Sequence, residues 1–129
     1  MTILLNYINY FDNDKNKFYT WAPSRKDEDG NIVQIGYPIY EERFMDFIKD
    51  AGKSGFLRHD YLDIISRRTP EGAKLEDFID MADEELFHSI FTFFIRGERF
   101  CDGFWARAID DKVFLKILLK LQLIEKSNT

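Results

Sequence analysis

Apolar residues recur three or four positions apart along most of the chain, which is the spacing of the buried face of an amphipathic helix. Glycine and proline interrupt this pattern and mark expected helix ends, as at Gly52 and Pro70. Asp83 stands before a long apolar run, at the position of a helix N-cap. The pattern predicts helices over residues 3–11, 41–51, 61–69, 75–79, 84–97, 100–109 and 112–126.

Two short runs rich in strand-forming residues lie near the N-terminus. The first is Lys17–Trp21 and the second is Asn31–Ile35, with a polar connection between them. This arrangement predicts a β-hairpin whose loop is longer than usual. A two-stranded hairpin alone is only marginally stable in water. We therefore expect its apolar side, including Trp21 and Ile32 or Val33, to pack on helices.

The helix expected over residues 84–97 carries apolar side chains around most of its circumference, which is typical of a helix surrounded by others. The predicted fold class is therefore α+β and predominantly α. We expect a bundle of six or seven helices packed around this one, with a small N-terminal β-hairpin. At 129 residues, the chain has the length of one domain, residues 1–129.

The charge balance narrows the classes of function. The formal net charge is -5, whereas proteins that bind nucleic acid directly normally present a basic patch. The single cysteine excludes an internal disulfide framework, and the N-terminal residues lack the basic region and cleavage site of a signal peptide. The charge-free run of residues 86–95 is too short to span a bilayer. We expect a cytoplasmic protein that binds neither membranes nor nucleic acid.

Four charged residues interrupt the most aromatic stretch of the chain: Arg96, Glu98, Arg99 and Asp102. One interpretation is structural, in which the guanidinium groups hold the carboxylates in a buried ion-pair cluster that fixes how two helices cross. The other is a pocket in which an arginine binds an anionic group while Glu98 or Asp102 orients it or acts as a base. The second interpretation would make the chain a small ligand-binding or hydrolytic domain.

The candidate nitrogen and sulfur metal ligands are His59, His88 and Cys101, and they fall on three different expected elements. The sequence has no HxxxH or CxxC pair, no phosphate-binding glycine loop, and no GxSxG or HExxH motif. It therefore predicts no metal, no cofactor and no catalytic residue. We expect His88 to be partly buried and Cys101 to be a small buried hydrophobic residue.

Residues 76–85 hold a run of carboxylates without a basic residue. Most such runs are solvated faces or serve helix starts. The alternative is a patch that occupies the basic groove of a nucleic-acid-binding protein. The carboxylates of this candidate partner-binding patch are Glu76, Asp77, Asp80, Asp83, Glu84 and Glu85.

The last expected helix, residues 112–126, carries more apolar residues than one buried stripe needs. Either two of its sides are buried within the domain, or one side is left for a second copy of the chain or another protein. The second alternative predicts a homodimer formed through this C-terminal helix.

Two stretches carry a family resemblance. Residues 36–40 (GYPIY) precede an acidic helix, and residues 96–109 (RGERFCDGFWARAI) precede a helix with an FLxIL pattern. In this order they resemble a family of small bacterial and phage domains of unknown function that carry an ERFCDG-like core. The resemblance spans about residues 37–121 and implies one compact, mostly helical domain. This chain has Asp110–Lys112 where Gly is common in the family.

These observations favour a small acidic, non-catalytic protein-binding module. A narrower hypothesis is an inhibitor encoded by a phage or mobile element that acts on a host nuclease such as a CRISPR effector. It rests on size, charge and the distribution of the family. The alternative is the small ligand-binding or hydrolytic domain that would use the charged cluster of residues 96–102.

Overall fold

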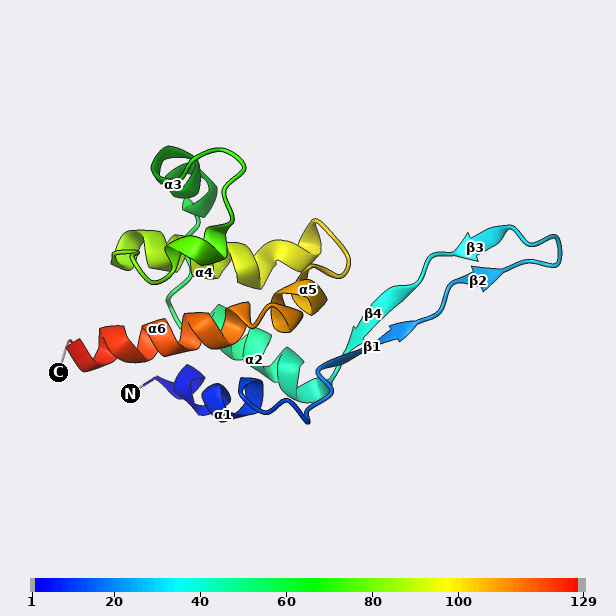
Figure 1. The fold of residues 1–129 in the computed structure, drawn as a ribbon, viewed down its shortest axis with the longest axis horizontal. Coiled ribbons are helices and arrows are strands. Elements are labelled where there is room, and N and C mark those ends of the chain that lie inside the picture. Colours follow the sequence, from blue (N-terminus) through cyan, green and yellow to red (C-terminus); the bar gives the residue numbers. More distant parts are fainter. Residues whose placement is uncertain (1, 128–129) are drawn as a thin grey trace.

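A helical body and a long two-stranded arm make up the computed structural model, which describes residues 2–127 (Figure 1). The predicted α+β, predominantly α fold is confirmed. In chain order the elements are η1 (Ile3–Tyr7), α1 (Ile8–Phe11), β1 (Tyr19–Ala22), β2 (Arg25–Lys26), β3 (Ile32–Gln34), β4 (Tyr37–Tyr40), α2 (Glu42–Lys53), α3 (Tyr61–Arg68), η2 (Leu75–Phe78), α4 (Glu84–Arg96), η3 (Gly97–Arg99), α5 (Phe104–Asp110) and α6 (Val113–Ser127), where η marks 3-10 helices.

Helix α4 lies at the centre of the body, with α3 on one side and α2 and α6 on the other (Figure 1). Its buried side chains surround most of its circumference, as the sequence predicts. Two of them are polar, Ser89 and Thr92, and each hydroxyl group donates to the carbonyl oxygen four residues earlier. Thr92 Oγ1 also accepts a 2.9 Å hydrogen bond from the Arg58 backbone, which ties the loop before α3 to this helix.

Phenylalanine rings fill the space between α1, α2 and α6. Phe11, Phe44, Phe47 and Phe114 are buried, and their ring centroids lie 4.9–6.2 Å apart, mostly in edge-to-face geometry. Such contacts add to the area that the rings bury, so this cluster joins the N-terminal helices to the C-terminal one. The Thr2 backbone N–H donates to the Glu125 carboxylate over 3.4 Å, which places the start of η1 beside α6.

Several predicted helix boundaries are confirmed. Asp83 caps α4 by accepting a 3.0 Å hydrogen bond from the Leu86 backbone, and α3 ends at Arg68, before Pro70. The helix expected over 75–79 is a 3-10 helix, as is most of the first one. Helix α5 begins at Phe104 rather than Phe100, because Gly103 has a φ of 90° that ends the preceding turn.

Lys112 is the one residue other than glycine with positive φ among residues 2–127, with a φ of 60°. It stands in the short turn between α5 and α6. This left-handed conformation favours glycine, so a lysine here is strained relative to a glycine. Lys112 Nζ forms a 2.9 Å salt bridge with Asp14 across the body.

The predicted hairpin exists, but its strand pairing was predicted wrongly. Strand β1 pairs with β4, so that Tyr19 lies opposite Tyr40 and Ala22 opposite Tyr37. Strand β3, which was expected to be its partner, pairs instead with β2 farther out, with a register shift between Arg25 and Lys26. The two ladders follow each other along one arm.

The expectation that the apolar side of the hairpin packs on helices is wrong for Ile32 and Val33, whereas one side of the Trp21 ring lies against Gly103 at the start of α5. The arm projects away from the helical body (Figure 1), and Trp21, Ile32 and Val33 are all exposed. The contacts with helices lie at the base of the arm, from Tyr19 to Trp21 of β1 and at Tyr40 of β4. There Tyr19 and Tyr40 are half-buried against the core.

Candidate functional site

The second half of the arm carries a row of exposed apolar side chains at alternate positions. Val33, Ile35, Tyr37 and Ile39 are exposed by 62%, 79%, 40% and 50% of their surface, whereas the residues between them are half-buried. Alternate residues of a strand point to opposite faces. Tyr37 and Ile39 therefore share the outward face of β4, and Ile35 and Val33 continue the exposed apolar row along the arm beyond Gly36. We call these four residues the arm stripe.

Gly36 joins the two ladders of the arm. A Cβ atom at this position would lie 2.9 Å from the Ala22 carbonyl oxygen. The two strands therefore approach closely where no side chain fits, which keeps the arm a continuous ribbon between β4 and β3. The stripe stands on both sides of this point.

The base of the arm is fixed to η3 and α5 by hydrogen bonds from two tyrosine hydroxyl groups. Tyr40 donates to Glu98 Oε1 over 2.8 Å, and Tyr19 donates to the Asp110 carboxylate over 2.8–2.9 Å. Burial and the bonded Asp110 carboxylate raise the pKa of Tyr19 to about 12, and burial together with Glu98 raises the pKa of Tyr40 well above its usual range. Both hydroxyl groups therefore remain donors at neutral pH.

A cavity of about 540 Å³ lies where the arm meets the body. Tyr19 and Trp21 of β1 line one side, and Phe93, Phe94 and Phe104 contribute aromatic surface from α4 and α5. Its charged lining residues are Lys74, Glu76, Asp102, Arg107, Asp110 and Asp111. We call this the arm-base cavity.

A second, apolar hollow of about 410 Å³ lies beside α3 and the η3–α5 turn. Tyr61, Leu62 and Phe100 line it, and Phe100 is exposed by 76% of its surface. The sequence pattern predicts Phe100 within a helix, whereas its ring stands on the surface in the turn before α5. The turn imposed by Gly103 explains the difference.

The four charged residues expected to form one cluster do not pair with one another. Glu98 accepts hydrogen bonds of 2.8 Å from the Gly103 and Trp105 backbone N–H groups, in addition to the bond from Tyr40. It thus satisfies the free donors at the start of α5. The predicted buried ion-pair cluster is wrong for residues 2–127, since no salt bridge there joins any two of the four.

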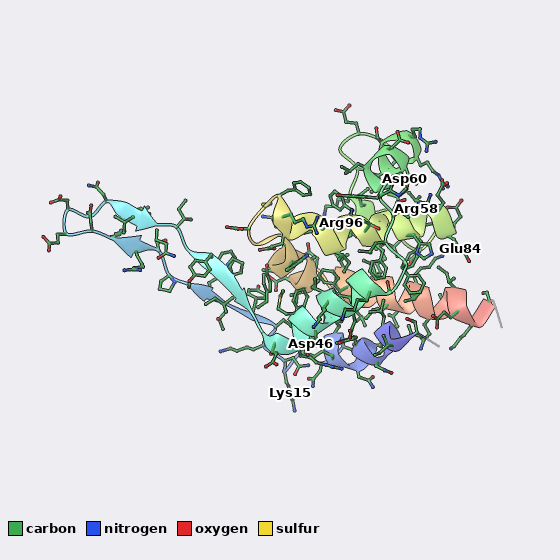
Figure 2. The ribbon with its side chains drawn as sticks, turned by 180° about the vertical axis from the view of Figure 1, so that it is seen from behind. Lys15, Asp46, Arg58, Asp60, Glu84 and Arg96 are labelled. Atoms are coloured by element: carbon green, nitrogen blue, oxygen red, sulfur yellow. The ribbon has the colours of Figure 1, made fainter. Side chains whose placement is uncertain are left out.

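The two arginines of that set, Arg96 and Arg99, lie in different environments. The Arg96 guanidinium lies 5.5 Å from the centre of the Tyr61 ring, a cation–π contact between α4 and α3, and Arg99 is exposed. Figure 2 shows Arg96 toward one end of α4 and Glu84 at the other, with Arg58 and Asp60 close together above the helix. Arg58 and Asp60 form a salt bridge of 3.0 Å. Asp102 is the one member of the set that lines the arm-base cavity.

The acidic stretch is partly neutralised by basic residues from other helices. Arg68 holds Asp83 with two hydrogen bonds of 2.8 and 3.0 Å and also contacts Glu85 at 3.2 Å. The Arg68 guanidinium and the Leu86 backbone lower the pKa of Asp83. Lys116 Nζ lies 3.9 Å from the Asp80 carboxylate and donates to the Glu76 carbonyl oxygen. These contacts reduce the local negative charge that imitation of a nucleic acid would need.

The histidine and cysteine predictions had different outcomes. His88 is partly buried, as predicted, with its ring stacked on Phe56 at 5.2 Å. Cys101 is exposed, so the prediction of a buried residue is wrong. Within residues 2–127, no group of three or more His, Cys, Asp and Glu side chains is placed to hold a metal ion.

The apolar surplus of the last helix is accounted for largely within the body. Val113, Phe114, Ile117, Leu118 and Leu121 of α6 are buried, whereas Leu119 and Leu123 are exposed one turn apart. No helix among residues 2–127 has both the length and the apolar character needed to span a bilayer.

Comparison with known proteins gives a family but no relative of known activity. Neither a curated protein nor a solved structure matches the chain. The family model described as a family of unknown function, DUF6508, matches residues 1–127. The chain therefore belongs to DUF6508, a family of unknown function.

Proposed function

We propose that this chain is a non-catalytic protein-binding module that docks on an apolar surface of a partner protein through the arm stripe. The observation that carries the proposal is the position of the stripe, which stands away from the helical body with its apolar side chains outward. Exposed apolar surface of this kind is a recurrent mark of protein–protein interfaces.

The shape of the arm supports the same function. Residues 33–39 in extended conformation span about 20 Å, enough for the four side chains of the stripe to engage one partner surface. The edges of the two ladders are free of other strands among residues 2–127, so a partner strand could add its backbone hydrogen bonds there. The hydrogen bonds of Tyr19 and Tyr40 hold the base in place, which lowers the entropy cost of binding.

In a narrower form of the proposal, the partner is a basic nucleic-acid-binding protein of the cytoplasm, such as a host nuclease or CRISPR effector. This chain would then be an inhibitor of that partner, encoded by a phage or mobile element. Its support is the net charge of -5 and the small size. The contacts of Arg68 and Lys116 with the acidic stretch weaken this form, so the arm stripe is the better supported contact surface.

The test is site-specific photocrosslinking with benzoylphenylalanine in the lysate of the cell that makes the protein. One variant carries the crosslinker at position 35 on the stripe. The control carries it at position 81, because Met81 is exposed by 73%, nearly as much as Ile35, but lies on the body. We expect a discrete adduct from position 35 and none from position 81.

Competition makes the experiment specific to the stripe. Excess unlabelled wild-type protein should abolish the adduct, and a Val33→Ser, Ile39→Ser double variant should not. Both positions are exposed, so the competitor should remain folded, which circular dichroism checks. Identical adducts at positions 35 and 81, or equal competition by the double variant, would overturn the proposal. An adduct with a second copy of the chain would identify the arm, rather than α6, as a homodimer contact.

A further inference from the structure

The arm-base cavity combines aromatic surface with an excess of carboxylates. Glu76, Asp102, Asp110 and Asp111 line it, against the two basic residues Lys74 and Arg107. All of these except Glu76, which is half-buried, are exposed. The lining therefore carries a net negative charge at neutral pH, and a positively charged ligand group complements it.

Two aromatic rings of β1, those of Tyr19 and Trp21, line the cavity beside its carboxylates. Trp21 lies over the start of α5, since a Cβ atom on Gly103 would come within 3.0 Å of its ring. Tyr19, two residues earlier on the same face of β1, reaches Asp110 at the other end of α5. About half of the Trp21 side chain remains exposed, so its ring is available to a ligand in the cavity.

We propose that the arm-base cavity binds an organic cation, an ammonium or guanidinium group carried on an apolar stem. The charged group would lie over the Trp21 ring near Asp102, because aromatic faces and carboxylates both attract cations. Asp111, beyond the other end of α5, would add to the negative potential of the lining. The stem would lie against Phe93 and Phe104. A volume of about 540 Å³ falls within the range of small-ligand sites.

This inference does not rest on the arm stripe. The cation could come from a lysine or arginine side chain of a partner protein, or from a free amine. In the first case, the arm stripe would hold the partner protein and the cavity would select a partner that presents a basic side chain beside it. The variants below leave Val33, Ile35, Tyr37 and Ile39 unchanged, so failure here and failure of the proposed function are distinguishable.

The test is titration of the full chain followed by the two indole N–H signals in nitrogen–proton correlation spectra. The probes are N-acetyl-lysine methylamide, its neutral counterpart N-acetyl-norleucine methylamide, and the free amine spermidine. We expect the lysine probe to shift the Trp21 signal, identified by its loss in Trp21→Leu, and to bind more weakly as salt rises. The Trp105 indole donates to the Phe94 carbonyl oxygen and should shift little.

Variants assign the binding to the cavity. Trp21→Leu should weaken binding of the lysine probe by about 2- to 30-fold, the range of a cation–π contact. Because this variant lacks the Trp21 indole, the backbone amide signals of Gly103 and Phe104 follow the titration there. The Asp102→Asn, Asp111→Asn double variant should also weaken binding of the lysine probe, and by more than the control Glu28→Gln does. The exposed Glu28 carboxylate lies on the arm, outside the cavity lining. Equal binding of the lysine and norleucine probes, or wild-type affinity in the double variant, would overturn the proposal. Tighter binding of the lysine probe than of spermidine would point to a protein partner, and the reverse order to a free amine.

Discussion

The Tyr40 hydroxyl group at the base of the arm donates a 2.8 Å hydrogen bond to Glu98, whose carboxylate also receives the first backbone donors of α5. The Ala106 backbone N–H in turn donates to the Tyr40 oxygen over 3.1 Å. One carboxylate thus starts a helix and anchors a strand. This pair couples the orientation of the arm to the position of α5, and so to the shape of the arm-base cavity.

Replacing Glu98 with Ala should lower the free energy of unfolding by about 1–3 kcal/mol, because the donors of Gly103, Trp105 and Tyr40 lose their acceptor. Urea denaturation followed by circular dichroism measures the change. The control is Asp102→Ala, which removes an exposed carboxylate from the same turn and should change stability by less than about 0.5 kcal/mol. Equal effects of the two replacements would contradict the capping role of Glu98.

Glycine 97 should not tolerate a methyl group. A Cβ atom there would lie 2.2 Å from ring carbons of Phe104, so Gly97→Ala must displace that ring and should cost about 1–3 kcal/mol. Gly52→Ala is the matched control within α2, where a Cβ atom meets nothing within 4 Å. It should stabilise the protein by about 0.5–1 kcal/mol. The two variants are therefore expected to change the denaturation midpoint in opposite directions.

Much of the helical body is predictable from sequence, because helix periodicity and caps are local signals. The apolar circumference of α4 and the Asp83 cap are examples. The arm is different, since its partner strand is set by contacts between distant residues. The outward-facing apolar residues at 33–39 gave a hydrophobic pattern that favours packing on a core rather than exposure.

The candidate site shows the same contrast between local signals, which the sequence reveals, and contacts between distant residues, which it does not. The sequence pattern predicts a helix over residues 100–109 that would include Asp102, with the charged residues 96–102 grouped in one cluster. The left-handed φ of Gly103 breaks that helix, leaving Glu98 to cap α5 and Asp102 to line a cavity. Glycine at position 103 was the one local signal for this turn. The cavity itself requires β1, α4 and α5 together, which no local pattern reveals.

The Cys101 thiol should react in the native protein. It is exposed, on the turn between η3 and α5. We expect one thiol per chain to be modified by a disulfide reagent such as dithionitrobenzoate without denaturant, at a rate within a few-fold of that in urea. A buried thiol would react only as fast as the body unfolds. A native rate lower by orders of magnitude would contradict the exposed position.

The stability of the body should fall as the pH drops below the usual pKa of histidine. Burial beside Phe56 lowers the pKa of His88, although the charge of Glu84 and the Phe56 backbone oppose this in part. The unfolded chain therefore binds a proton at a higher pH than the folded one, and stability contributed by neutral His88 is lost progressively as pH falls from about 7 toward 5.

His88→Phe should flatten this fall, because it keeps a ring against Phe56 and removes the titrating group. The Nδ1 atom of His88 is buried without a hydrogen-bond partner, so replacing the imidazole with a phenyl ring breaks no hydrogen bond of that atom. The control is His59→Gln, which removes an exposed imidazole and should leave the wild-type pH dependence in place. The measurement is the urea midpoint of the three proteins between pH 7 and pH 5. Parallel curves for wild type and His88→Phe would show that His88 titrates alike in the folded and unfolded chain.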